Sequence, residues 1–367
     1  MDDPFPPRHR TATVRDAGTG IDTEAVREAV ATARAGATTP DDVAYDHATE
    51  HHWDGDPPEH AGALGPFPDR RGEQNGVVFH RGELVAEWGD TTRVDHCFSV
   101  AKSFLSLLAG VASDRGLVDV TDPVGEYVED GGFEGHNAAV TWEHLLQGTS
   151  EWEGTLFGKP DSVDRNRPVG RDADAVGDRG VRDLRDPGTY WEYNDVRINR
   201  LALALLRLWG EPLPEVLARE VLGPVGASGA WSWHGYRNST VEVEGRAMES
   251  VSGGGHWGGG LWSSTRNLAR VGLLLANDGA WGGRQVVSAS WLDRATTPCD
   301  VEPGYGYLFW LNTDGERFPG TPESAFAALG YGSNQVWIDP EDDLVVVLRW
   351  VESEAANEVY RTLSDAV

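Results

Sequence analysis

The sequence predicts an α+β fold, in which one antiparallel sheet is built from strands near both ends of the chain and flanked by helices, with a mainly helical subdomain inserted at about residues 115–250. Two strand-like blocks predict the sheet, one at residues 76–88 and one at residues 335–348. Helical patterns lie between these blocks, separated by long connections rich in Gly and Asp. The chain must therefore cross between the two halves of the fold at least twice.

The first 75 residues are expected to form an N-terminal extension with one helix and an acidic loop. Asp22-Thr23-Glu24-Ala25 has the composition of a helix start, and the Ala-rich stretch that follows it to Ala35 predicts a surface helix. Residues 37–75 are rich in Asp, His, Pro and Gly, which is typical of a loop. The main domain is expected to span residues 76–352.

The strand-like blocks each predict a β-hairpin. Apolar residues fill 76–79 and 84–88, and Gly82 between them can take the positive φ that a tight turn needs. Residues 335–340 and 344–348 form the second pair, joined by an acidic turn. A C-terminal helix is expected from about Ala355, packed on the sheet within residues 353–367. Helices between the hairpins are predicted at residues 100–114, 141–147, 196–209 and 265–277.

The charge balance excludes partners that are recognised through phosphates. The 367 residues hold 59 Asp and Glu against 31 Lys and Arg, a formal net charge of −28. Such a chain repels nucleic acid and anionic bilayers, so we expect neither as a partner. Only two lysines occur, a bias typical of proteins that work in molar salt. With no signal-peptide pattern, no run of some 18 apolar residues and only two cysteines, the chain is expected to be cytoplasmic and without a disulfide framework.

Ser99 and Lys102 form the most informative pair in the sequence. Apolar residues recur on one helical face after Ser99, so a buried helix should begin there. Residues three apart share a helix face. A lysine that is desolvated near a helix N-terminus loses its proton more easily. A neutral Lys102 would then accept the proton of Ser99. The alternative is a capping serine with a lysine whose amine reaches solvent.

Two further segments add groups that fit this chemistry. Pro187-Gly188 predicts a turn, and Tyr193 follows it just before the next helix, where a phenol can reach a cleft and relay a proton. The glycines around Tyr331 leave a strand edge open, so a backbone N–H there can point at a substrate carbonyl. Taken alone, the aromatic residues near 190 would be core packing and the glycines a simple turn.

In this order and spacing the three segments resemble the serine β-lactamase and penicillin-binding-protein superfamily, and within it the esterases and 6-aminohexanoate-dimer hydrolase-like enzymes. The resemblance covers about residues 75–352 and implies a β-lactamase/transpeptidase-like fold. It implies that Ser99 is acylated, that Lys102 accepts its proton and that Tyr193 is the tyrosine of the Tyr-x-Asn motif. The oxyanion hole would be the backbone N–H groups of Ser99 and Tyr331, next to Gly330. No cofactor and no metal are implied.

The chain departs from the family pattern in two places. Asp195 stands where the Tyr-x-Asn motif has its asparagine, so an anion could pair with Lys102, raise its pKa and weaken it as a base. Asn194 or Asn199, one helical turn further on, is the candidate for the role of the missing amide. Ala328-Leu329-Gly330 replaces the motif that usually opens with Lys or His, which removes an anchor for a substrate carboxylate. We therefore expect a small neutral ester or amide as the substrate.

Other features of the sequence leave alternatives open. A β-lactamase or D-Ala-type carboxypeptidase is the alternative enzyme, and a non-catalytic binding protein with a degenerate cleft is the alternative from another class. Trp152 and Trp257 lie in Gly-rich loops and would line an acyl pocket or simply pack. The His and acidic residues between 46 and 60 lack helical ligand spacing and predict a solvated loop rather than a metal site. Cys97 is expected to be a buried apolar residue.

Overall fold

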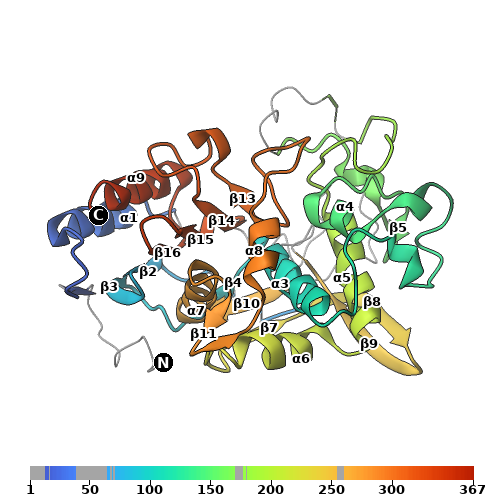
Figure 1. The fold of residues 1–367 in the computed structure, drawn as a ribbon, viewed down its shortest axis with the longest axis horizontal. Helices are drawn as coiled ribbons and strands as arrows, with labels where there is room; N and C mark the ends of the chain where they lie inside the picture. The colour runs from blue at the N-terminus through green and yellow to red at the C-terminus, as the bar shows by residue number, and fades with distance from the viewer. Residues whose placement is uncertain are drawn as a thin grey trace.

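A seven-stranded antiparallel sheet organises one half of the molecule, in the order β1-β3-β2-β16-β15-β14-β13 (Figure 1). This is a computed structural model, and it describes residues 13–15, 17–38, 64–66, 68, 71–169, 177–178, 180–253 and 260–367. The strands are β1 (Thr13–Val14), β2 (Asn75–His80), β3 (Glu83–Trp88), β13 (Trp310–Leu311), β14 (Phe326–Gly330), β15 (Asn334–Asp339) and β16 (Leu344–Arg349).

The two predicted hairpins meet at the centre of this sheet. β2 pairs with β16, with Val77 opposite Val347, so the N-terminal and C-terminal blocks form one continuous surface. The turn between β2 and β3 has Gly82 at φ +75°, as the sequence predicted. The predicted sheet built from both ends of the chain is confirmed.

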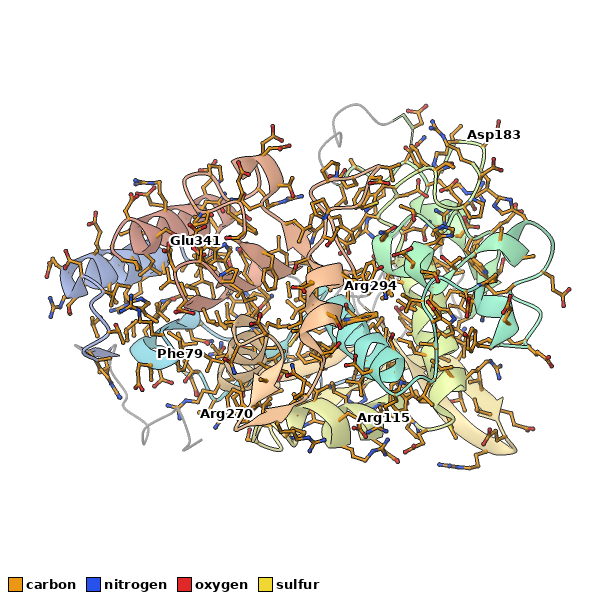
Figure 2. All side chains as sticks on the ribbon, in the orientation of Figure 1. Phe79, Arg115, Asp183, Arg270, Arg294 and Glu341 are labelled. Atoms are coloured by element: carbon orange, nitrogen blue, oxygen red, sulfur yellow. The ribbon has the colours of Figure 1, made fainter. Side chains whose placement is uncertain are left out.

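Helices cover both faces of the sheet, because its strands bury both sides. Val77 and Phe79 of β2 pack toward the face that carries α3 (Val100–Asp114) and α7 (Thr265–Ala276). Val78 points to the opposite face, which α1 (Thr23–Ala35) and α9 (Ser353–Ser364) cover. Figure 2 shows Phe79 within the sheet half and Arg115 beside α3. The alternation along β2 thus divides the apolar core into two clusters.

The second half of the molecule contains the inserted segment, at the right of Figure 1. Its helices are α4 (Trp142–Gln147), α5 (Asp195–Trp209) and α6 (Leu213–Leu217), with a π-helical turn η6 (Ala218–Leu222) and 3₁₀ turns η2 (Val124–Glu126), η3 (Gly135–Ala139) and η4 (Asp161–Asp164). Two hairpins that the sequence analysis did not predict also lie here, β5–β6 (Thr155–Leu156, Lys159–Pro160) and β8–β9 (Gly235–Val243, Arg246–Val251). The insertion thus contains two short hairpins beside its helices.

A small sheet links the insertion to the main sheet half. β10 (Leu261–Ser264) pairs with both β4 (Val94–His96) and β7 (Trp231–Trp233). The remaining elements are β11 (Ala280–Trp281), β12 (Arg284–Gln285), α8 (Ala289–Ala295) and the 3₁₀ turn η7 (Thr313–Gly315). None of the helices in the described ranges is both long and apolar enough to cross a bilayer.

Candidate active site

Ser99 lies at the N-terminus of α3, immediately after a sharp turn from β4. Phe98 in this turn has φ +50°, a left-handed conformation that costs about 1–3 kcal/mol for a non-glycine residue. Its ring packs against the rings of His96, Tyr331 and Trp350, which hold the turn in place. Ser99 does not use its hydroxyl to cap the helix. The hydroxyl instead faces Lys102.

Lys102 is buried one turn along α3, with only 2% of its surface exposed. Its Nζ donates a hydrogen bond to Ser99 Oγ at 2.8 Å and lies 2.7 Å from Asp195 Oδ1. The Tyr193 ring centroid is 4.6 Å from the same nitrogen. Three side chains from two distant segments therefore meet at one amine.

The charge of this amine differs from the neutral form that the sequence predicted. Burial lowers the pKa of Lys102, but the Asp195 carboxylate and the Tyr193 phenol raise it by more, so the pKa lies above its usual value. Lys102 is thus an ammonium in the free protein. Lys102 forms the ion pair with Asp195 that was expected because aspartate stands at the asparagine position of the motif.

Asp195 is the first residue of α5, where the helix dipole favours a negative charge. Its Oδ2 forms an ion pair with Arg167, so the carboxylate is shared between two cations. Its backbone N–H donates to Asp164 Oδ2 at 2.9 Å. The sequence analysis missed both Arg167 and Asp164, because they lie about 30 residues before Asp195 in a segment without a regular pattern.

Tyr193 is held in an aromatic cluster. Its ring stacks on Trp310 at a centroid distance of 5.7 Å and contacts Trp191 and Tyr305 at 6.3 and 6.5 Å. The Arg167 guanidinium lies 5.4 Å from the Tyr193 centroid. These contacts fix the orientation of the phenol beside Lys102.

Gly330 ends β14 directly against the start of α3. A Cβ added at Gly330 would lie 2.4 Å from the carbonyl oxygen of Cys97 and 3.3 Å from the backbone nitrogen of Ser99, so only glycine fits. The strand end thus lies beside the N–H group expected in the oxyanion hole. Tyr331 follows at the turn, with 63% of its surface exposed and its backbone oxygen accepting from Asn334 Nδ2 at 2.7 Å.

Asn194, Asn199 and Trp152, which were predicted to bind substrate or to support the site, make contacts that hold the surrounding structure. Asn194 caps α5, because its Oδ1 accepts from the backbone N–H of Arg197 and its Nδ2 donates to the carbonyl of Asp161. The Asn199 amide binds the Gly253 N–H and the Tyr236 hydroxyl.

Trp152 is buried, and its indole N–H donates to the Gly132 carbonyl at 2.7 Å, so it packs rather than lining an acyl pocket. Trp257 and the acidic His-containing stretch between residues 46 and 60 lie outside the described residues. Within the described part of the chain, no three His, Cys, Asp or Glu side chains are grouped so as to hold a metal ion.

A cavity of about 160 Å³ borders the site on the side of Tyr193. Its walls come from Asn166, Arg167, Val169 and residues 189–193 and 301–302, and they combine apolar side chains with the Arg167 guanidinium and the side chains of Glu192 and Glu302. An engineered cavity of about 150 Å³ holds one benzene molecule, so this space suits one ring or a short alkyl chain.

Known proteins share this arrangement of strands and helices. A solved penicillin-binding-protein homologue from Caulobacter crescentus superposes with a TM-score of 0.59 at 16% identity, over 97% of this chain and all of that one. A solved family VIII carboxylesterase superposes with a TM-score of 0.57 at 16% identity, over 80% of this chain and 92% of that one. At such low identities these likenesses show the fold, and they confirm the β-lactamase/transpeptidase-like architecture that the sequence predicted.

Sequence comparison extends the likeness to a family. The chain is 23% identical to the 6-aminohexanoate-dimer hydrolase of Paenarthrobacter ureafaciens over 276 residues, which is 68% of this chain and 64% of that relative's length. The family model described as Beta-lactamase matches residues 73–359. Because this match covers well over half of the 367 residues, the protein belongs to the β-lactamase family.

Proposed function

We propose that the protein is a serine hydrolase that cleaves a small ester or amide through an acyl-enzyme on Ser99. The observation that carries the proposal is the 2.8 Å hydrogen bond between Lys102 Nζ and Ser99 Oγ, with Tyr193 against the same amine. The relatives named 6-aminohexanoate-dimer hydrolase and family VIII carboxylesterase support this substrate class.

The proposed reaction has two halves. Ser99 Oγ attacks the carbonyl carbon, its proton passes to the amine form of Lys102, and the oxyanion binds the backbone N–H groups of Ser99 and Tyr331. Collapse of this intermediate breaks the bond to the leaving group, which takes a proton through Tyr193. The proton that reaches the leaving group comes from Lys102 by way of Tyr193, so Lys102 is an amine again when water attacks the acyl-enzyme. Lys102 accepts the water proton and returns it to Ser99 Oγ as the bond between Oγ and the acyl carbon breaks and the acid leaves.

The raised pKa of Lys102 makes the rate of the proposed reaction depend on pH. Only the amine form can accept a proton, and Asp195 favours the ammonium form. We therefore expect kcat/KM to rise with pH until Lys102 has lost its proton.

A neutral substrate fits the rest of the site. The strand that carries a cation in many relatives has Ala328 and Leu329 here, so the site lacks that anchor for a substrate carboxylate. The cavity beside Tyr193 supports a compact substituent.

Covalent labelling tests the proposal. In molar KCl a fluorophosphonate should add to Ser99 with a stoichiometry of one, and a short-chain chromogenic ester should be hydrolysed. Ser99→Ala should lose both signals. Ser106→Ala, a change at another buried serine of α3, should keep them.

The results also separate the alternatives. A folded protein that takes up no label is a binding protein, for which the Asp195–Lys102 ion pair is the favouring observation. Faster turnover of a chromogenic cephalosporin than of any ester identifies a β-lactamase instead.

A further inference from the structure

The carboxylate of Asp195 is divided between two cations in the buried site. Oδ1 lies 2.7 Å from Lys102 Nζ, and Oδ2 forms the ion pair with Arg167. Asp195 is fully buried and Arg167 is mostly buried, with 20% of its side chain exposed. Water screens such charges weakly, so each cation affects how strongly the carboxylate holds the other.

Among the described residues, few other charged or titratable groups face this arrangement. Ser99 and Tyr193 contact Lys102 from α3 and from the segment before α5. Asp164 accepts from the Asp195 N–H and lies 3.9 Å from Arg167. The buried phenols of Tyr236 and Tyr305 sense the charge of Asp195, and burial raises the pKa of both, so they stay neutral. In the described part of the chain, two cations and two carboxylates thus meet here.

We propose that Arg167 is a positioning residue for the hydrolysis: by holding Oδ2 of Asp195, it weakens the hold of this carboxylate on Lys102 and keeps the amine form within reach of Ser99. The inference rests on the proposed function. It explains how an enzyme can carry aspartate where its relatives carry a neutral amide. The second cation offsets the added negative charge.

The inference predicts opposite shifts for two substitutions. Among the residues that the structure describes, Arg167→Gln leaves Asp195 with Lys102 as its paired cation, so Lys102 should lose its proton only at higher pH. Asp195→Asn removes the carboxylate, so burial dominates and Lys102 should lose its proton at lower pH. Once Asp195 is an asparagine, Arg167 no longer has that carboxylate to hold, so the Lys102 midpoint of the double variant should match that of Asp195→Asn alone.

The test measures this titration in two ways. The first is the pH on the acidic side at which kcat/KM for a short-chain ester is half of its maximum. The second needs no activity: lysine labelled with ¹³C at Cε gives only two signals, because the chain has only Lys102 and Lys159. Lys159→Arg assigns them, and the Lys102 shift is followed with pH.

For Arg167→Gln we expect both midpoints to rise by about one pH unit, which is a tenfold loss of kcat/KM below the midpoint and little loss well above it. Arg167→Lys should recover most of the wild-type midpoint. Arg165→Gln is the matched control, because Arg165 lies two residues away and pairs with Asp161 instead. Its midpoint should stay at the wild-type value.

Three results would overturn the inference. The first is an unchanged Lys102 midpoint in Arg167→Gln, and the second is a shift in Arg165→Gln as large as that in Arg167→Gln. The third is a double variant whose midpoint shift equals the sum of the two single shifts, which would mean that Arg167 acts on Lys102 directly. Failure of the proposed function looks different: the NMR midpoints would shift as expected, while the wild-type protein would neither hydrolyse esters nor take up the Ser99 label.

Discussion

At the scale of single residues, one amine joins the groups that the site needs. Lys102 contacts the Ser99 hydroxyl, the carboxylate of Asp195 and the phenol ring of Tyr193, all within the protein interior. Its position three residues after Ser99 places it on the first turn of α3 below the hydroxyl. In the proposed mechanism the Lys102 amine, which contacts all three groups, therefore accepts the proton of Ser99.

The first prediction removes this amine. Lys102→Ala should lower kcat for a chromogenic ester by at least about 10²-fold, because general-base catalysis contributes on that order. Lys159→Arg, at the other lysine of the chain, should leave kcat within about twofold. Circular dichroism checks that both variants fold. Retention of more than a tenth of wild-type activity in Lys102→Ala would assign the base to another group.

Sequence reasoning located these residues as far as local spacing and motif order allow. Ser99 and Lys102 share one helix, so their contact follows from helical geometry alone. Only one of the two cations that pair with Asp195 could be predicted. Lys102 was expected because Asp195 stands at the asparagine position of the motif, whereas Arg167 lies in an irregular segment whose path the sequence does not show. Likewise, nothing in the sequence distinguished an asparagine that caps α5, as Asn194 does, from one that faces the lysine.

At the scale of elements, the β15–β16 hairpin contains a buried acid at its turn. Asp339 is completely buried, and its Oδ1 accepts the backbone N–H groups of Glu341 and Asp342. Burial raises the pKa of Asp339 to about 6, with the neighbouring charges of Asp342 and Glu341 adding to the effect. Glu341, labelled in Figure 2, lies in the same turn.

The second prediction concerns this turn. A carboxyl whose pKa is raised on folding stabilises the folded state at low pH, and this stabilisation is lost as the pH rises from about 4 to about 6. Asp339→Asn keeps the acceptor oxygen without the charge, so it should increase the free energy of unfolding at pH 8 by about 2 kcal/mol and much less at pH 4.5. Urea titrations at both pH values measure this. Asp343→Asn, at an exposed position of the same turn, should show no such pH dependence, and equal effects at both pH values for Asp339→Asn would contradict the prediction.

The insertion is held together by a buried ionic network centred on Glu151. Its carboxylate is fully buried and pairs with Arg182 at 2.5 Å and with Arg197 of α5 at 2.7 Å. Burial alone would raise the pKa of Glu151, but these two arginines and the backbone N–H of Arg185 lower it to about 2. The network ties the loop after α4 to the helix that begins at Asp195.

The third prediction follows from this network. Glu151→Gln leaves two buried arginines short of a countercharge and should lower the free energy of unfolding by about 3–5 kcal/mol at pH 7. Since the lowered pKa stabilises the fold above about pH 4.5 and this is lost toward pH 2, the difference from wild type should shrink as the pH falls. Glu153→Gln, at a side chain that is 59% exposed, is the control and should cost less than about 1 kcal/mol. An equally mild effect of Glu151→Gln, by urea titration, would show that the network adds no stability.

Elements whose own residues form a continuous apolar face could be predicted from the sequence, whereas elements placed by contacts with other segments could not. The β2–β3 and β15–β16 hairpins and the long helices carry continuous apolar faces, and all of them form close to the predicted bounds. The β8–β9 hairpin was missed because β8 alternates irregularly, with exposed residues on both of its faces. Its place is set by contacts with α5 and not by its own pattern.

At the scale of the whole molecule, the cavity beside Tyr193 forms where the insertion meets residues 301–302. Val301 is 42% exposed at this cavity, so Val301→Trp should fill part of it. As the fourth prediction, we expect this variant to lower kcat/KM for a hexanoate ester by about tenfold relative to the acetate ester of the same chromophore. Leu117→Trp, on a similarly exposed residue after α3, should leave the ratio unchanged. An unchanged ratio in Val301→Trp would place the substrate elsewhere.

The net charge of −28 leads to the last prediction, which concerns the whole surface. At 0.1 M salt the Debye length is about 10 Å, so the carboxylates repel one another across the molecule, whereas at 1 M it is about 3 Å and the repulsion is confined to neighbours. The buried pairs of Glu151 and Asp195 are shielded from salt and should change little. We therefore expect the Tm, followed by circular dichroism, to fall by at least about 10 °C between 3 M and 0.1 M KCl. Sucrose at the same osmolality strengthens burial without screening charge, so it should not restore the lost stability. A Tm that is independent of KCl, or one that sucrose restores fully, would show that charge repulsion does not set the salt requirement of this fold.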